Sequence, residues 1–487
     1  MKKKSYNKIQ QTRLKKKAQK NKNREAKQLK KEIAEQQKKD SHLIYLLYRT
    51  IHEHFPHLYQ WMREIDDCRK KASDYELAAH LTACLAMFLF KAGSRNQYNN
   101  HRDNRQFRCN FEKLFKLPMP HGDSVHNVIA LLDESQVEQL KQQMVRALLA
   151  RKTFHKSRYR GKWFRIAIDG SGVVSFDQSH CSRCLTSTSK KGKVTYYHNV
   201  LDARLITPNG FSISIATVWI ENPEGDYDKQ DCERKAFLRL ADKLKKAFSR
   251  LPIIILADGL YPYEGFFLKC KENNWAFSIT FKEGCLPSVW EEISTMKRLQ
   301  AGNCRIRTYH RPNGKALTKE HSWITSIDYK GYTLNWLECK ETLQWTETNK
   351  QGKPIKKSQT KTFCYLTDLP VNWDNVIETS ETGRLRWKIE NEGFNTLKNG
   401  GYGMQHKWAR KSYQGLKNYY QFMQMGHLIN QLLVKSIEFQ KEYMQGKNHP
   451  TEKNFWGMIV SVLIWVNIKA KKLKKIRLTR RQFILVT

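Results

Sequence analysis

Hydrophobic positions recur with helical spacing from Ser41 to Lys156. The segments HLIYLLYRTIHEHF and VHNVIALLDESQVEQLKQQMVRALLA carry apolar residues at helical intervals, and the polar SRNQYNNHRDNRQ between them is expected to be a loop. Asp133 is predicted to begin the last of these helices, because its side chain can accept a hydrogen bond from the free N–H groups there. We therefore expect residues 41–156 to form a helical domain, with one buried face made of Leu131, Leu132, Val137, Leu140, Val145 and Leu148.

The spacing changes to that of strands at Trp163. WFRIAIDGSGVVSF and VTYYHNVLDARLITPNGFSISIATVWI have near-alternating β-branched and aromatic residues, and Pro208-Asn209-Gly210 marks a hairpin turn. LPIIILADG is typical of a strand buried on both faces. Further elements are a strand and two helices, at Trp275–Phe281, Lys229–Ser249 and Pro262–Glu272. The order β-β-β-α-β-α-β predicts an α/β fold with a mixed sheet over residues 157–281, since βαβ crossovers make their strands parallel.

The rest of the chain divides into a β-rich and a helical part. Residues 282–380 are rich in strand formers, with a hairpin turn expected at Lys330-Gly331, and we interpret them as a separate β insertion. Helical periodicity returns in residues 381–430, interpreted as the last core helix, and again in the C-terminal residues 431–487.

The charge balance indicates the kind of partner. The 487 residues include 87 Lys and Arg against 46 Asp and Glu, a net charge of +41 that favours a polyanion. Residues 1–40 hold sixteen basic and four acidic residues, so we expect a disordered arm, which is either a DNA contact that orders on binding or a solvated tail. The helical domain is interpreted as DNA-binding, although spacing alone does not separate a DNA-reading helix from a packing helix.

A membrane is the weaker partner. The longest apolar run, Phe455 to Ile468, is 14 residues long and contains three small or polar residues, whereas a membrane span needs about 20 apolar residues. We expect no secretory leader, because the N-terminus is lysine-rich with no apolar segment before His42. The eleven scattered cysteines suit a reducing compartment, so a cytoplasmic protein is predicted.

Two aspartates stand where buried strands are expected to end in glycine turns. Asp169 follows FRIAI, and Asp258 follows IIILA. Taken singly, each is more simply a turn residue. On neighbouring strands, however, two such carboxylates can converge on a pair of Mg²⁺ ions about 3.5–4 Å apart.

A third carboxylate is expected from the helix at 381–430. Glu390 and Glu392 both qualify by type, but on a helix they project about 200° apart and cannot share one site. We choose Glu390, because Arg386 lies one turn before it and can orient a carboxylate or contact a phosphate.

AIDGSG, ILADGLYP and GRLRWKIENEGFN, in this order, resemble the acidic motifs of DDE transposases of bacterial and archaeal insertion sequences. The resemblance covers residues 163–427 and is greatest to the group with an RNase H-like core, a β-rich insertion before the last acid and a Y-R-E-K signature. It implies an RNase H-like core in which Asp169, Asp258 and Glu390 bind two Mg²⁺ (or Mn²⁺) ions. Gly383 and Leu397 stand at the tyrosine and lysine positions of the signature, with Lys398 one residue later.

The activity that the resemblance implies is metal-dependent cleavage of transposon-end DNA at its terminal inverted repeats, followed by strand transfer into double-stranded target DNA. Such enzymes generally act as homodimers. The expected DNA contacts are Arg386, Lys398, His406, Lys407 and Arg410, although the last three also fit a solvated basic face. The alternatives are an RNase H-like nuclease without strand transfer and a catalytically inactive DNA-binding derivative.

A second metal site is indicated by the sequence His180-Cys181-Ser-Arg-Cys184. A structural zinc ion needs four nitrogen or sulfur ligands, and Cys181, Cys184, His198 and Cys232 are the candidates, with free loop thiols as the alternative. A nearby acidic run is interpreted instead as capping the helix that follows it, because negative side chains complement the helix dipole. Its members are Glu224, Asp226, Asp228, Asp231 and Glu233.

Overall fold

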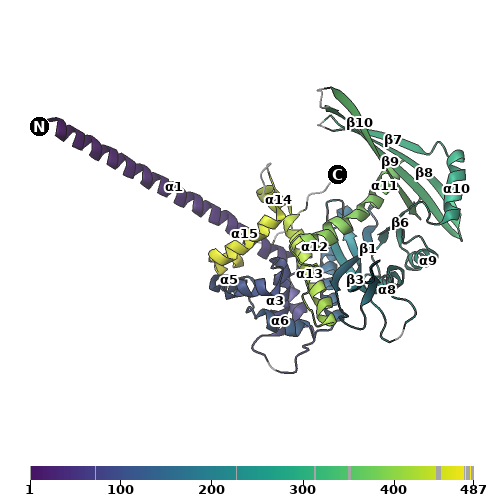
Figure 1. The fold of residues 1–487 in the computed structure, drawn as a ribbon, viewed down its shortest axis with the longest axis horizontal. Helices are drawn as coiled ribbons and strands as arrows, with labels where there is room; N and C mark the ends of the chain where they lie inside the picture. The colour runs from purple at the N-terminus through teal and green to yellow at the C-terminus, as the bar shows by residue number, and fades with distance from the viewer. Residues whose placement is uncertain are drawn as a thin grey trace.

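The computed structural model describes residues 2–71, 73–225, 227–311, 314–348, 353–445, 451–476, 478 and 483. It has a mixed α/β architecture with 46% helix and a mixed sheet of ten strands, which confirms the predicted fold class at this level. A long N-terminal helix leads into a group of helices, and the sheet lies beyond them (Figure 1).

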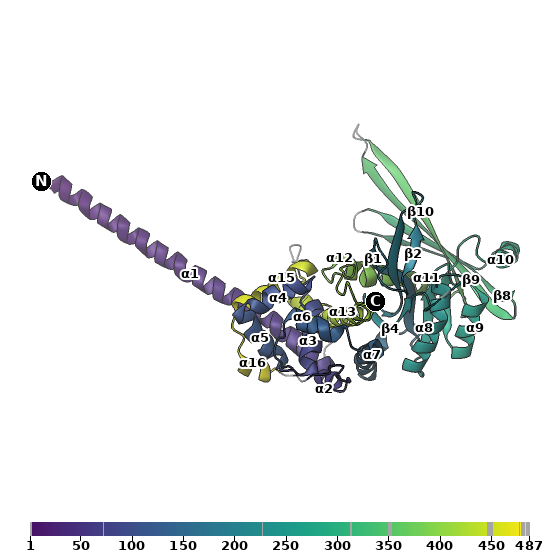
Figure 2. The same cartoon turned by 60° about the horizontal axis from the view of Figure 1, so that its bottom comes forward.

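The first helix, α1 (Lys2–His54), projects far from the rest of the molecule (Figures 1 and 2). It takes the place of the disordered arm expected at residues 1–40. Lys, Gln, Glu and Ala, which make up much of this segment, are all strong helix formers. Its C-terminal end is anchored, because Leu43, Leu47 and Ile51 are buried in the core and α1 contacts the C-terminal helices.

The helical domain comprises α2 (Leu58–Arg63), α3 (Leu77–Leu89), α4 (Arg95–Asp103), α5 (Arg105–Phe115), α6 (Gly122–Ile129) and α7 (Glu134–Ala150). Asp133 caps α7 as predicted, accepting a 3.0 Å hydrogen bond from the Ser135 N–H. The loop expected at 94–106 is instead helical in α4 and α5, because Ser94 and Asn104 cap two short helices. The predicted buried face is correct except for Leu131, which precedes the cap of α7 and is 64% exposed.

The sheet core follows the predicted element order, with one additional short strand. Its elements are β1 (Phe164–Phe176), β2 (Leu185–Thr188), β3 (Val194–Ile206), β4 (Ser212–Ile220), α8 (Glu233–Ala247), β5 (Ile253–Ala257), α9 (Glu264–Asn273) and β6 (Ala276–Thr280). β3 lies between β1 and β4 and is antiparallel to both. β5 is parallel to β1 and to β6, and its five residues are all buried, as the apolar run predicted.

The β-rich segment extends the same sheet and does not form a separate unit. It consists of α10 (Pro287–Leu299), β7 (Cys304–His310), β8 (Ala316–Tyr329), β9 (Tyr332–Thr348) and β10 (Pro354–Thr367). Residues 365–367 of β10 pair antiparallel with β6, so the backbone N–H and C=O groups at the otherwise open edge of the core sheet gain hydrogen-bond partners. The predicted hairpin turn joins β8 to β9, with positive φ at both Lys330 and Gly331.

The C-terminal part is largely helical, but residues 381–430 form several short helical segments and a non-helical stretch at 400–412, and not the one core helix expected. It begins with α11 (Val376–Arg384), the 3₁₀ turn η2 (Leu385–Trp387), the π-helical segment η3 (Ile389–Asn395) and α12 (Thr396–Asn399), and continues with α13 (Tyr413–Val434), α14 (Ile437–Tyr443), α15 (Glu452–Trp465) and α16 (Ala470–Lys474). α13 lies between the helical domain and the sheet and contacts α3, α7 and β4 (Figure 2). Across the described residues, every helix is too short or too polar to cross a bilayer.

Candidate active site and metal centre

Asp169 and Asp258 lie side by side on the parallel strands β1 and β5. The register pairs Ala167 with Leu256, and continued by two residues it sets Asp169 level with Asp258. β5 ends just before Asp258, whose Oδ1 accepts a 2.9 Å hydrogen bond from the N–H of Leu260 in a turn. Asp169 is not followed by the expected turn, because β1 continues along β3 to Phe176. Asp169 is nevertheless level with the point at which the neighbouring strand, β5, has just ended.

Arg386 joins the first aspartate to Glu390. Its Nη1 lies 3.4 Å from Asp169 Oδ2, and its Nη2 lies 3.0 Å from Glu390 Oε1. The two residues come from the tightly wound η2 and the wider η3, which contact β5 and β1 respectively. Glu392 pairs instead with Lys388 at 2.9 Å, so the two glutamates take different partners, as their spacing predicted.

The structure gives a steric reason why Gly383 stands where the Y-R-E-K signature has a tyrosine. A Cβ atom at Gly383 would lie 2.5 Å from the ring of Tyr365 on β10, so a tyrosine does not fit there. Leu397 is fully buried, while Lys398 is half-buried on α12. The ring of Tyr365 therefore occupies the space that a side chain at position 383 would need.

Glu233 is a fourth carboxylate of this site, which the sequence analysis interpreted as a helix cap. It stands in the first turn of α8, but its Oε1 lies 2.0 Å from where a Cβ of Gly170 would be, next to Asp169. Its Oε2 accepts a 3.4 Å hydrogen bond from the hydroxyl of Tyr261. The sequence feature that points to Glu233 is Gly170: it has no side chain, so a carboxylate can lie next to Asp169.

The other members of the acidic run point elsewhere. Asp231 forms a 2.5 Å ion pair with Arg239, and Glu224 pairs with Arg183 at 2.8 Å. Asp228 is exposed, and Asp226 lies outside the described residues. The run is therefore not a single ligand set.

Burial is the main cause of the pKa shifts in this site, and neighbouring carboxylates add to them. Burial raises the pKa of Asp169 to about 7; Arg386 opposes this rise, while Glu390, Glu233 and Asp258 add to it. Burial and then Asp258 raise the pKa of Glu233, against the hydrogen bond from Tyr261. The guanidinium of Arg386 thus pairs with two of these four carboxyl groups, and a further positive charge beside Asp169 would relieve the repulsion from its neighbours.

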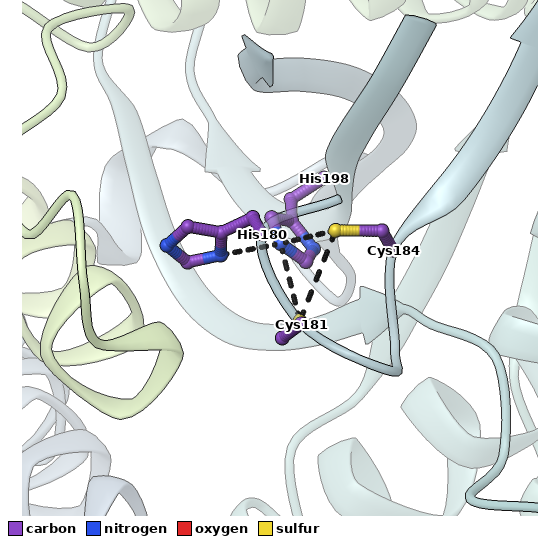
Figure 3. Close-up of side chains that lie close together, drawn as sticks. All are labelled: His180, Cys181, Cys184 and His198. Atoms are coloured by element: carbon purple, nitrogen blue, oxygen red, sulfur yellow. Dashed lines mark hydrogen bonds between the residues drawn. The ribbon is translucent and has the colours of Figure 1, made fainter. Parts of the chain in front are cut away.

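A tighter cluster is formed by His180, Cys181, Cys184 and His198 (Figure 3). One ligand atom from each lies within 4.8 Å of the other three, so the group can hold a metal ion. Three of the four predicted zinc ligands are present. The fourth, Cys232, is exposed at the N-terminus of α8 and is not part of the group; His180 takes its place. In the described part of the chain, this is the one group of at least three His, Cys, Asp or Glu side chains whose ligand atoms all lie within 4.8 Å of one another.

Three of the predicted DNA contacts, His406, Lys407 and Arg410, lie on the segment before α13, whereas Lys398 lies on α12. His406 and Arg410 are exposed, and Lys407 is half-buried with its Nζ 4.9 Å from the centre of the Phe176 ring. Trp408, between them, is buried and anchors the segment in the core. The segment therefore presents basic side chains from a fixed backbone.

No protein-family model matches this chain, and no curated protein sequence matches it.

Proposed function

We propose that the chain is a DDE-type DNA transposase, which cleaves the ends of its element in a metal-dependent reaction and joins the freed 3′ ends to target DNA. The observation that carries the proposal is the placement of carboxylates from three elements around Asp169: Asp258 is level with it just past the end of β5, and Arg386 bridges it to Glu390.

The topology supports this proposal. The strand order β4-β3-β1-β5-β6, with antiparallel pairing on one side of β1 and parallel pairing on the other, suits an RNase H-like core. The strands β7–β10 then stand where the β-rich insertion is expected, between β6 and the glutamate. The net charge of +41 favours a DNA substrate, and we propose a homodimer bound to paired ends.

The donor set fits Mg²⁺ or Mn²⁺. Asp169, Asp258, Glu390 and Glu233 offer only carboxylate oxygens, which hard divalent cations prefer. Burial is the main cause of the raised pKa of Asp169, and the neighbouring carboxylates Glu390, Glu233 and Asp258 add to it; a bound cation would oppose both effects. When bound, a pair of such ions would lower the pKa of the attacking water and stabilise the leaving 3′ oxygen.

The side chains of the chain itself have distinct roles in this proposal. Asp169 is held within β1 and Asp258 by the turn that follows β5, which limits their freedom to follow a substrate. Glu390 is the more exposed acid and lies on the wider η3 winding, so it is the ligand best able to adjust. Arg386 can release Asp169 and pair with a DNA phosphate, because guanidinium groups bind carboxylate and phosphate by the same geometry.

The proposal is tested with labelled duplexes that carry the DNA flanking the gene. In Mg²⁺, D169N, D258N and E390Q should each lower cleavage by at least about a thousandfold, about 4 kcal/mol of transition-state stabilisation, while keeping DNA affinity. The matched control is E392Q, two residues from Glu390 and paired with Lys388, which should cleave like the wild type.

Two readouts separate the alternatives. Joining of a labelled 3′-OH end to a plasmid distinguishes a transposase from a nuclease on the same core. Metal-dependent nicking by the wild-type protein distinguishes both from an inactive DNA-binding derivative. Full cleavage by any of the three acidic-site variants would remove that residue from the proposed site.

A further inference from the structure

Four of the six separations between ligand atoms of the His/Cys cluster match those of a tetrahedral zinc site, and all six are within 4.8 Å. Zn–S bonds of about 2.3 Å and Zn–N bonds of about 2.0–2.1 Å give tetrahedral edges of about 3.8 Å between two sulfurs, about 3.6 Å between sulfur and nitrogen and about 3.3 Å between two nitrogens. The Sγ atoms of Cys181 and Cys184 are 3.9 Å apart, and His198 Nε2 lies 3.6 and 3.4 Å from them. His180 Nδ1 lies 3.3 Å from His198 Nε2.

The chemistry of the cluster agrees with its geometry. The two sulfurs are far beyond the roughly 2.05 Å of a disulfide, so both are free to ligate. Two thiolates would balance the double charge of the ion, and two neutral imidazoles would complete four ligands, all from the protein. Cys184 and His198 are buried. Such a closed site is structural, because it leaves no position for a substrate.

Both histidines contact the segment that leads into α13. The ring of His198 stacks on Tyr413, the first residue of α13, with ring centres 4.1 Å apart. Phe176 stacks on His180 with ring centres 4.5 Å apart, and Lys407 Nζ lies over the Phe176 ring, 4.9 Å from its centre. The cluster therefore contacts Tyr413 directly and Lys407 through the ring of Phe176.

The backbone of this segment approaches the cluster as well. The backbone carbonyl groups of Ala409 and Arg410 lie beside the His180 ring. His180, Cys181 and Cys184 come from the β1–β2 connection, whereas His198 comes from β3. An ion bound to all four would therefore fix the connection to the sheet, and the connection would hold the basic segment in place.

We propose that His180, Cys181, Cys184 and His198 bind a structural Zn²⁺ ion, and that this ion holds residues 406–411 against the sheet so that Lys407 and Arg410 contact the phosphates of DNA. The zinc site and its effect on the segment stand independently of catalysis. The phosphate contact rests on the proposed function.

The first experiment measures zinc in the full-length protein, purified without chelators, by mass spectrometry of the metal. The wild type should hold about one zinc per chain, and C184S should lose it. H180Q, which changes a half-buried ligand and so disturbs folding less, should bind zinc at least about tenfold more weakly in competition with a chromogenic chelator. C232S is the matched control and should retain zinc, because Cys232 lies outside the cluster.

Two results would overturn the zinc site. One is a wild-type protein that neither contains zinc nor takes it up on titration. The other is a C232S variant that loses zinc as completely as C184S does. If C184S loses zinc only because it misfolds, H180Q still tests the site, because its zinc affinity is measured as well as its zinc content.

The second experiment measures what the ion holds. Hydrogen exchange of the amides in residues 403–412 should speed up at least about tenfold when zinc is removed from the wild type or when His180 is changed, and should return when zinc is added back to the wild type. K407Q and R410Q should keep zinc but bind DNA several-fold more weakly at low salt.

The outcomes of the second experiment separate the parts of the proposal. Unchanged exchange after zinc loss would refute the positioning role. Normal DNA affinity in K407Q and R410Q would refute the phosphate contact. A protein that holds zinc and orders the segment but binds no DNA would refute the proposed transposase function and leave the zinc site in place.

Discussion

The pKa of Asp169 in the acidic site is strongly shifted by folding. Its pKa is raised to about 7 by burial and by Glu390, Glu233 and Asp258, although Arg386 acts in the opposite direction. An ordinary aspartate titrates near 3.8, so folding makes this proton harder to remove. The protonated form stabilises the fold fully below about pH 4, and that stability is lost as the pH rises through about 7.

This shift predicts a pH-dependent stability in the absence of Mg²⁺. Each pKa unit corresponds to about 1.4 kcal/mol, so the free energy of unfolding of the wild type should fall by a few kcal/mol, relative to D169N, between pH 4 and pH 8. E233Q should reduce the fall, because it removes one of the charges that raise the pKa of Asp169. Urea unfolding at several pH values measures the difference.

The buffer for this measurement should lack Mg²⁺ without containing a strong chelator, so that the His/Cys cluster keeps its ion. Adding Mg²⁺ at pH 8 should restore stability to the wild type but not to D169N. A wild type and a D169N variant with parallel stability curves over this range would show that Asp169 titrates normally.

At the scale of elements, a buried ion pair on β3 is linked to β4 by hydrogen bonds. Asp202 and Arg204 are both fully buried, and Oδ2 of the aspartate lies 2.8 Å from Nη1 of the arginine. The hydroxyls of Ser214 and Thr217 on β4 donate to Asp202 Oδ1 at 2.7 and 2.9 Å. Lys141 of α7 donates to the same two hydroxyls at 3.0 Å, so the network also reaches the helical domain.

D202N should therefore destabilise the protein by about 3–5 kcal/mol, because it leaves the guanidinium of Arg204 buried without its carboxylate. The control is D242N, which removes a largely exposed pair with Lys269 and should cost less than about 1 kcal/mol. Urea unfolding of both variants gives the comparison. Equal losses would mean that the buried pair contributes no more than an exposed one.

The elements that the sequence predicted well are those with a local cause. The apolar run of β5, the Lys330-Gly331 turn and the Asp133 cap each depend on a few adjacent residues, and all three were correct. Asp169 and Asp258 could be proposed as neighbours because a parallel pairing follows from the element order.

The errors have a non-local cause. Whether Cys232 or His180 joins the cluster depends on where the α8 start lies relative to the β1–β2 connection, which spacing does not give. Glu233 fits a helix-capping pattern and also faces Asp169, and only the packing of α8 against the sheet separates these roles. The continuity of the β-rich segment with the core sheet does not follow from its sequence pattern, because the pairing of β10 with β6 links residues far apart in the chain.

At the scale of the whole molecule, α13 connects the helical domain to the sheet. Asn418 donates hydrogen bonds to the carbonyls of Ile129 and Leu132 at 2.8 Å on the helical side. Gln431 accepts from the Ser212 N–H at 2.7 Å and donates to its carbonyl at 3.0 Å on the sheet side. Because buried polar groups need partners, these bonds specify how the two parts fit together, and the basic segment before α13 is fixed between them.

The long helix α1 carries a dense group of basic side chains: residues 1–40 hold sixteen basic and four acidic residues. Residues 19–32 are exposed, and they include Lys20, Lys22, Arg24, Lys27, Lys30 and Lys31. If these side chains lie along a DNA backbone, each neutralised phosphate contributes about 0.9 to the slope of log affinity against log salt. Replacing all six by glutamine, which keeps helix propensity high, should lower the magnitude of that slope by up to about 5.

Binding of labelled duplex DNA at several salt concentrations measures this slope, and circular dichroism checks that the variant keeps its helix content. The wild type should show steep salt dependence, because its charge is spread over α1, the helical domain and the segment before α13. A slope unchanged by the six substitutions would place the DNA on the basic surfaces around the acidic site and leave α1 outside the complex. A shallow slope in the wild type would contradict an extended DNA surface altogether.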